Sequence, residues 1–350
     1  MQKFIFKTSF FVFPFFLLYI LDITMYNVAG GSDLSRLAYL PDFYKNTKEK
    51  LSRNDETIRF YSDFYTDSLK HNYDLLIIGD SFSDAVHTFS NKLAKKKSVL
   101  VVKGQNEKNP IQRLSSLINS GFFDTINVKE VLLESVERYV VERALSTNLC
   151  DSSMQNNVID KTLITNTSNA NISKPKHDFF SSQPLYFGFN TLRHLLCKDV
   201  EFNSTVQQYS LTKKLFSYYK SKSILVLKED IQKLYYNNDS KKIYYLNNVL
   251  NLISKKLKNK NVGFNVMICP DKYDLYYDFF VNNNNYKRPH FFQKLYACKQ
   301  EYNFIPVFSI LRNQLDKNVQ DLYLYDDTHW STKSVCLITK YLERYDTSNF

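Results

Sequence analysis

Five short apolar runs, each followed by a polar or glycine-containing turn, recur between residues 74 and 308. They cover residues 74–78, 98–102, 128–135, 262–268 and 304–308. Apolar runs of this length are typical of strands that are buried on both faces of a parallel sheet. We therefore predict a strand at each run.

Helical patterns separate these runs. They cover residues 110–119, most of 204–260 and 332–343. A chain that alternates strand and helix predicts an α/β fold, a three-layer, doubly wound parallel sheet with helices on both faces. In such sheets ligands bind beyond the carboxyl ends of the strands. The turns expected at that edge are 79–81, 104–106, 134–138, 270–272 and 326–329.

Polar regions lie before and within this pattern. Residues 145–180 are rich in Asn, Ser and Thr, which predicts a surface insertion that we extend to about residues 145–235. Residues 26–70 are also polar and are predicted to form a stalk with entry helices. The expected organisation is a membrane segment at 1–25, the stalk, and one α/β domain at 71–345.

The N-terminus carries a long apolar segment. Residues 9–20 contain no charge, and apolar residues on both sides extend the run from Phe4 to Leu21, with Lys3 and Lys7 at its start. A membrane span needs about 17–25 residues, so the segment is a transmembrane helix or the core of a signal peptide. We favour the anchor. The lysines keep the N-terminus cytoplasmic, which predicts a single-pass membrane protein with its domain outside the cytoplasm.

Charge and aromatic content leave three classes of partner open. The formal net charge is +11 and aromatic residues make up 16% of the chain, a balance that suits nucleic acid, an anionic membrane face or an acidic polymer. Export makes nucleic acid the least favoured of the three. Only seven glycines occur, against an average share of about 7% of residues, which argues against glycine-rich phosphate-binding loops.

The five cysteines have no Cys-x-x-Cys spacing, so we expect no structural zinc site. Export permits disulfides, and Cys150 and Cys197 could pair across the polar insertion. The alternative, in which all five are reduced and buried, fits the sequence equally well.

A serine and a histidine occupy two of the turns at the expected ligand-binding edge. Ser81 lies in Gly-Asp-Ser-Phe after the first strand, and His329 lies in Asp-Asp-Thr-His-Trp near the C-terminus. A serine becomes a nucleophile when a base takes its proton, and a histidine held by an acid is suited to that task. Gly-Asp-Ser alone is more often a turn and helix cap. The two motifs together favour a Ser-His-Asp triad, with Asp326 or Asp327 as the acid.

These motifs resemble those of the SGNH (GDSL-like) hydrolases and acyltransferases. Residues 79–82 are similar to the first block of that superfamily and residues 326–329 to its last. The chain resembles more narrowly the alginate O-acetyltransferase-like branch of periplasmic polysaccharide acetyltransferases. Residues 327–331, 270–276 and 133–138 are similar to its Asp-x-His-Trp, Pro-x-Lys-x-x-x-Tyr and Glu-Arg segments.

The resemblance covers roughly residues 70–140 and 240–345. The serine block precedes the histidine block, as is general for SGNH proteins, whereas the alginate enzymes have the reverse order. The alginate-type spacing selects Asp327 as the triad acid and the general SGNH spacing selects Asp326; we favour Asp327.

The Gly-x-Asn-Asp block of SGNH esterases is not visible in the sequence. The resemblance then implies the backbone N–H groups of Ser81 and Gly104 as oxyanion donors, with Asn106 in place of the usual asparagine.

Three side chains near these motifs are candidate substrate contacts. Lys272 could bind a substrate carboxylate or form an ion pair with Glu137. Trp330 could stack on a sugar ring or pack in the core, and Tyr276 has similar alternatives. Glu137 and Arg138 are expected to brace the loops beneath the site.

The resemblance implies an exported O-acyltransferase, anchored in the inner membrane with its domain in the periplasm, that moves acetyl groups to hydroxyls of a cell-surface polysaccharide. Ser81 would carry the acyl group, His329 would act as base and then as acid, and Asp327 would orient His329. No metal or nucleotide cofactor is needed, and a multispanning membrane protein would supply the acyl donor. A carbohydrate esterase and a catalytically silent subunit of a polysaccharide assembly are the alternatives.

Overall fold

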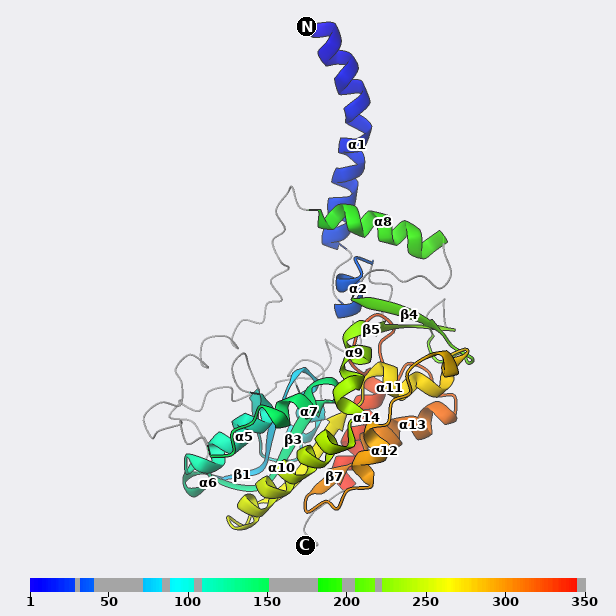
Figure 1. The fold of residues 1–350 in the computed structure, drawn as a ribbon. Coiled ribbons are helices and arrows are strands. Elements are labelled where there is room, and N and C mark those ends of the chain that lie inside the picture. The colour runs from blue at the N-terminus through cyan, green and yellow to red at the C-terminus, as the bar shows by residue number, and fades with distance from the viewer. Residues whose placement is uncertain are drawn as a thin grey trace.

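The computed structural model describes most of the predicted α/β domain and the N-terminal segment. The described residues are 1–28, 32–40, 72–83, 89–103, 109–150, 182–196, 205–217 and 222–344. Strands and helices alternate along them, as the sequence predicts (Figure 1).

A parallel sheet of five strands forms the centre of the fold. The strands are β1 (Asn72–Gly79), β2 (Val99–Lys103), β3 (Asn127–Val136), β6 (Gly263–Cys269) and β7 (Asn303–Ile305), in the order β2-β1-β3-β6-β7. The chain passes from β1 outward to β2 and then returns to place β3 on the other side of β1. Such a reversal leaves a crevice at the carboxyl ends of β1 and β3, where doubly wound sheets bind ligands.

Helices cover both faces of this sheet, so the predicted three layers are confirmed. Alternate side chains of β1 point to opposite faces, with Leu75 and Ile77 in one apolar core and Leu76 and Ile78 in the other. The first core is completed by α4 (Phe89–Ala94), α11 (Lys272–Tyr276), α13 (Val307–Asp316) and α14 (Thr332–Arg344). The second is completed by α5 (Pro110–Asn119), α6 (Phe122–Thr125), α7 (Glu137–Leu145), α10 (Ser240–Lys258) and α12 (Phe291–Tyr296).

The region from 204 to 260 is only partly helical, which corrects the sequence prediction. β4 (Val206–Ser210) and β5 (Ser223–Leu227) pair in an antiparallel ribbon before α9 (Lys228–Asn237) and α10 begin. Val206 and Tyr209 are buried on β4, and β5 is a short apolar run of the kind that marks strands elsewhere in the chain. The predicted strand at 304–308 also ends early, because Pro306 has no backbone N–H to continue the sheet and α13 starts at Val307.

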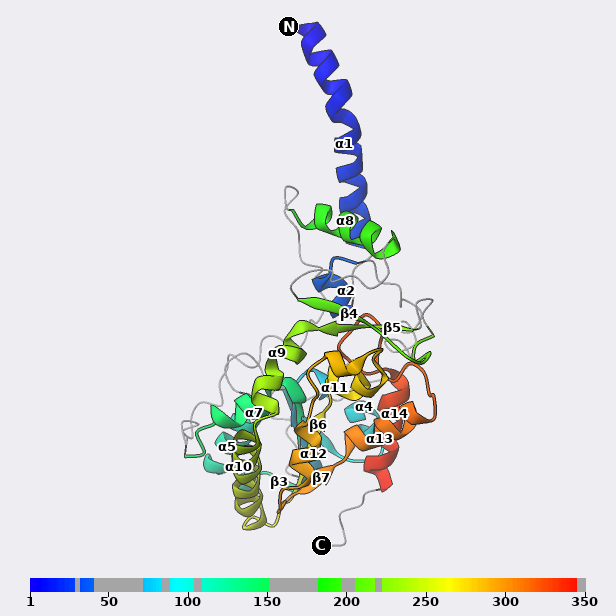
Figure 2. The ribbon, with the colours of Figure 1, turned by 45° about the vertical axis from the view of Figure 1, so that its right-hand side comes forward.

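The N-terminal helix α1 (Gln2–Val28) projects away from the domain (Figures 1 and 2). Its 26-residue span Gln2–Asn27 has a mean hydropathy of 2.0 in its most apolar window, and none of that window is buried. The helix is long and apolar enough to cross a membrane. A core-helix interpretation is excluded by its exposure.

The short segment after α1 does not extend as a stalk over its described part. Residues 32–40 include α2 (Asp33–Leu37), and Leu34, Ala38 and Leu40 are at most 2% exposed in the first apolar core. Residues 41–71 of the predicted stalk lie outside the described residues. The predicted insertion contributes β4, β5, α9 and α8 (Gln183–Leu196), and its residues 151–181 also lie outside the description.

Single 3-10 turns at η1 (Ser81–Ser83), η3 (Tyr277–Phe279) and η4 (Asn283–Asn285) complete the fold. Of the described cysteines only Cys269 is buried, so the alternative of five buried thiols is wrong. Cys150, which could pair with Cys197, is exposed without a disulfide in the described part of the chain, and Cys197 lies outside that part. The pairing stays a prediction.

Candidate active site

Ser81 and His329, near opposite ends of the sequence, meet at the carboxyl edge of the sheet. The hydroxyl of Ser81 lies 2.8 Å from Nε2 of His329. The other ring nitrogen of His329, Nδ1, lies 2.7 Å from a carboxylate oxygen of Asp327. Ser81 is exposed and the side chain of His329 is 29% exposed. The three side chains therefore form a continuous Ser-His-Asp line with its serine end open to solvent.

The turn that carries Ser81 depends on a glycine. A Cβ atom at Gly79 would collide with the hydroxyl of Ser83 and with the carboxyl group of Glu134. Glu134 takes that space at the neighbouring end of β3, where it accepts hydrogen bonds from the Ser83 hydroxyl (2.7 Å) and the backbone N–H of Asp80 (2.8 Å). Only a residue without a side chain lets β1 end this close to β3.

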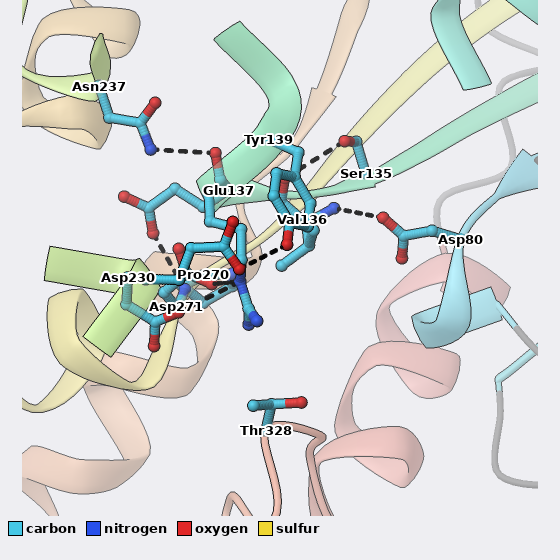
Figure 3. Close-up of polar contacts among 12 residues, drawn as sticks. Asp80, Ser135, Val136, Glu137, Tyr139, Asp230, Asn237, Pro270, Asp271 and Thr328 are labelled. Carbon is cyan, nitrogen blue, oxygen red and sulfur yellow. Dashed lines mark hydrogen bonds and ion pairs between the residues drawn. The ribbon is translucent and has the colours of Figure 1, made fainter. Parts of the chain in front are cut away.

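Asp80, the residue before the serine, ties the turn to β3. Its carboxylate accepts from the backbone N–H of Phe82 at 3.3 Å and from that of Val136 at 3.0 Å. Nη1 of Arg143, on α7, donates to the same carboxylate at 2.7 Å. The N–H of Val136 is seen pointing at Asp80 in Figure 3. Asp80 therefore holds the position of Ser81 rather than taking part in proton transfer.

The two acids of this turn, Asp80 and Glu134, have pKa values shifted in opposite directions. Burial by itself raises the pKa of Asp80, but the guanidinium of Arg143 lowers it below its ordinary value. Burial raises the pKa of Glu134 well above its ordinary value, and the charge of Asp80 adds to this effect. The charge of Arg143 therefore favours the ionised form of Asp80, and burial favours the neutral form of Glu134.

The loop that carries His329 is closed by its own backbone. Tyr323 and Trp330 form an antiparallel bridge, and the N–H of Leu324 donates to the carbonyl of His329 at 3.1 Å. Trp330 packs edge-on against Phe82, with ring centroids 5.1 Å apart, and the rings of Phe82 and His329 are 5.0 Å apart. Because Phe82 directly follows Ser81, this aromatic contact fixes the serine turn against the histidine loop.

A buried lysine supports the same loop from below. The ammonium of Lys272 donates to the carbonyls of Leu324 (2.9 Å), Tyr325 (2.8 Å) and Asp327 (3.2 Å). Burial lowers the pKa of Lys272 to about 8, with nearby carboxylates, Asp326 first among them, opposing the shift. Lys272 therefore shapes the backbone on which the triad acid stands.

The three side chains predicted to contact a substrate are buried in this structure. Lys272, Tyr276 and Trp330 are 1%, 0% and 1% exposed, so none presents its side chain to a substrate. Lys272 bonds to carbonyls and does not pair with Glu137, which accepts from the backbone N–H of Asp271 at 2.9 Å. For Trp330, core packing is the alternative that the structure favours.

The two adjacent acids before His329 have separate roles. Asp327 contacts the imidazole, whereas Asp326 is 1% exposed and points to the N-terminal segment. The hydroxyls of Ser32 and Ser35 donate to Asp326 at 2.7 and 3.0 Å. This geometry favours Asp327 as the triad acid and makes Asp326 the attachment point of residues 32–40.

A second carboxylate that the sequence interpretation missed stands beside the triad. Asp33, the first residue of α2, lies with a carboxylate oxygen 3.7 Å from Nδ1 of His329. Its two oxygens accept hydrogen bonds from the backbone N–H of Thr328 (2.7 Å) and from the Thr328 hydroxyl. The only local signal is the apolar spacing of Leu34 and Ala38, which predicts one buried helical face but not what α2 contacts.

Asp33 and Asp327 both act on the titration of the histidine. Burial lowers the pKa of His329, but the hydrogen bond and charge of Asp327, with the charge of Asp33, outweigh burial and raise it. Burial and the charge of Asp327 raise the pKa of Asp33 to about 6. The titrations of the ring and of the second carboxylate therefore depend on each other.

Asp33, Asp327 and His329 are also a geometric candidate for a cation site, since one ligand atom from each lies within 4.8 Å of the others. Hydrogen bonds already use these atoms, because Thr328 donates to both oxygens of Asp33 and Nδ1 faces Asp327. A metal ion would have to displace them. The donor set fits a hydrogen-bonded triad better than a metal centre.

An ion cluster braces the strand ends beneath the site. Nε of Arg138 lies 2.9 Å from Asp271, at the end of β6, and 3.2 Å from Asp230 on α9. Figure 3 shows this group on one side of Val136 and Asp80 on the other. Arg138 and Glu137 are 7% and 1% exposed, in keeping with the bracing role expected for them.

The oxyanion donors remain a prediction. Gly104 and Asn106 lie outside the described residues, and the backbone N–H of Ser81 belongs to the 3-10 turn η1.

Comparison with protein-family models, with curated proteins and with solved structures finds no significant match to this chain.

Proposed function

We propose that this protein is a membrane-anchored, exported serine O-acyltransferase of the SGNH type. The observation that carries the proposal is the line of two short contacts from Ser81 through His329 to Asp327, 2.8 and 2.7 Å long. The exposed serine, the histidine base and the acid that orients it are the parts that acyl transfer through an acyl-enzyme requires.

The reaction runs in two steps with the proton carried by His329. The oxygen of Ser81 attacks the acyl carbonyl as Nε2 takes the hydroxyl proton, and the leaving group departs with that proton. An acceptor hydroxyl then gives its proton to Nε2 and attacks the acyl-serine, and Ser81 regains a proton. Asp327 stabilises the ring while it is charged in both steps.

We propose a sugar hydroxyl of a cell-surface polysaccharide as the acceptor and acetyl as the group transferred. Three features support this choice: the resemblance of the motifs to polysaccharide acetyltransferases, the net charge of +11, which suits an acidic polymer, and α1, which would hold the site at a membrane surface. In this proposal the domain lies in the periplasm, and a multispanning membrane protein delivers the acyl donor.

Hydrolysis is the second candidate function. Ser81 is exposed and His329 is partly exposed, so water can reach the acyl-serine. The same triad would then act as a carbohydrate esterase.

The proposal is tested with p-nitrophenyl acetate and a fluorophosphonate probe. We expect an initial burst of nitrophenol and labelling of wild-type protein, with both lost in Ser81→Ala and His329→Gln. Ser240→Ala, a change at an exposed serine on α10, serves as the matched control and should behave as wild type. Acetyl transfer to an added oligosaccharide favours the transferase, and release of acetate alone favours the esterase. Wild-type activity in Ser81→Ala would overturn both.

A further inference from the structure

Helix α8 has an apolar face that points away from the protein. Leu185, Phe189, Leu192 and Leu196 are 54%, 63%, 60% and 81% exposed. Their spacing of three and four residues places them on one side of the helix. A helix that packs on a globular core has the opposite arrangement, with its apolar stripe inward.

The inward face of α8 is more polar and is held by specific contacts. Asn190, Thr191 and His194 are buried there, beside Phe187. The side-chain amide of Asn190 donates to the carbonyl of Ala38 at 3.2 Å, which joins α8 to the segment that carries Asp33. This more polar face makes the contacts with the protein, which leaves the apolar side chains on the outward face.

Helix α8 also contacts the end of α1 where the apolar run stops. The rings of Tyr26 and Phe187 meet edge-on with centroids 5.4 Å apart. A Cβ atom at Gly188 would collide with the carboxylate of Asp22, so the glycine allows the two helices to approach closely. In both ribbon views α8 lies crosswise at this end of α1, between α1 and the domain (Figures 1 and 2).

We propose that α8 is an interfacial membrane helix, whose outward face lies in the boundary between headgroups and acyl chains of the bilayer that α1 crosses. Leucine and phenylalanine on one side of a helix that lies in the membrane plane are typical of such helices. Tyr186 and Arg193, both exposed at the rim of the apolar face, match the aromatic and basic residues found at headgroup level.

The position of α8 favours lipid over other occupants. The exposed face begins where α1 leaves the span of a membrane, so lipid is already present at that level once α1 is inserted. Contacts with Asp22 and Tyr26 of α1 and with residues 38 and 39 fix the helix crosswise. This orientation lays its whole apolar face on a flat surface. The triad would then stand at a fixed height above that surface, because residues 32–40 join α8 and α1 to the His329 loop.

Tryptophan fluorescence tests this proposal in the full chain. The chain has one tryptophan, Trp330, which is 1% exposed and gives a constant background. Leu192→Trp places a reporter on the outward face of α8. Phe13→Trp on α1 and Tyr244→Trp on α10 are controls at positions of similar exposure, 58% and 61%, against 60% for Leu192. Each variant is placed singly in nanodiscs of phosphatidylcholine brominated either near the headgroup or near the chain end.

We expect the added emission of Leu192→Trp to fall severalfold with lipid brominated near the headgroup and much less with lipid brominated near the chain end. Phe13→Trp should be quenched most by the deeper bromine, and Tyr244→Trp by neither. The proposal would be overturned if brominated lipid quenched Leu192→Trp no more than Tyr244→Trp. It would also be overturned if the bromine near the chain end quenched Leu192→Trp more than the bromine near the headgroup. Lack of quenching in Phe13→Trp would overturn it too, because α1 would not span. Phe189→Trp repeats the test if Leu192→Trp does not fold.

Discussion

A carboxylate oxygen of Asp33 lies 3.7 Å from Nδ1 of His329, beside the oxygen of Asp327 that contacts the same nitrogen at 2.7 Å. Asp33, a few positions after the apolar helix α1, thus reaches the base of the candidate triad. Two carboxylates face one imidazole, and the nearer one orients the ring while the farther one holds Thr328 and adds negative charge.

Asp33→Asn should change the pH dependence of ester cleavage more than its maximum rate. In the proposed mechanism neutral His329 is the active base, so activity should rise with pH as the ring loses its proton. The charge of Asp33 helps to raise the pKa of His329, so its removal lowers that pKa and moves the rising limb to lower pH. The plateau should fall far less than the roughly 10⁴-fold expected when a triad acid is lost.

The measurement is the p-nitrophenyl acetate rate across the pH range, with Asp124→Asn as the control. Asp124 is a surface aspartate on α6 whose side chain is 63% exposed. An unchanged rising limb in Asp33→Asn would show that Asp33 has only a structural role.

Substitution of Asp327 should mainly lower activity, whereas substitution of Asp326 should mainly lower stability. Asp327→Asn removes the group that orients the imidazole, so activity should fall by about 10³–10⁴-fold with little loss of stability. Asp326→Asn weakens the attachment of Ser32 and Ser35 and leaves the Lys272 ammonium less compensated. Its activity should stay within about tenfold of wild type, while the free energy of unfolding falls by about 1–3 kcal/mol.

Steady-state rates and urea unfolding of both variants separate these roles. A folded Asp326→Asn without activity, beside an active Asp327→Asn, would assign the triad acid to Asp326 instead.

The five strands of the parallel sheet and the two motifs of the candidate triad were predictable because their signals are local. Buried strands give continuous apolar runs, and Ser81 and His329 each stand in a short motif at a turn. The contribution of Asp33 was not predictable, since it arises only when the segment after α1 packs on a loop near the C-terminus. The orientation of Lys272 was hidden for a similar reason: the three carbonyls that hold its ammonium meet only in the folded chain.

A chelator should leave ester cleavage unchanged. The atoms of Asp33, Asp327 and His329 that could hold a cation are engaged in hydrogen bonds with Thr328 and with one another. We expect the same burst and steady rate before and after treatment with EDTA, and no gain on adding Zn²⁺ or Mg²⁺. A loss of activity with EDTA that added metal restores would instead favour metal-assisted chemistry at this cluster.

Glu134 should tolerate an amide but not a truncation. Burial raises its pKa well above the ordinary value, which favours the neutral acid. Glutamine is neutral and keeps the volume and an acceptor for Asp80 and Ser83. Glu134→Gln should therefore stay within about 1 kcal/mol of wild type in unfolding free energy. Glu134→Ala leaves a buried N–H and a hydroxyl without their acceptor beside a new cavity, which costs about 2–4 kcal/mol.

The activity of the two Glu134 variants should follow the same order as their stability. Because Glu134 and Asp80 hold the turn of Ser81 against β3, nitrophenol release should persist in Glu134→Gln and fall in Glu134→Ala. Unfolding and rate measurements on Glu301→Gln, a surface glutamate whose side chain is 38% exposed, give the reference. If Glu134 were ionised in the native protein, the amide would remove a charge that the fold relies on. Glu134→Gln would then lose as much stability as Glu134→Ala, and the division of charge between Asp80 and Glu134 would be wrong.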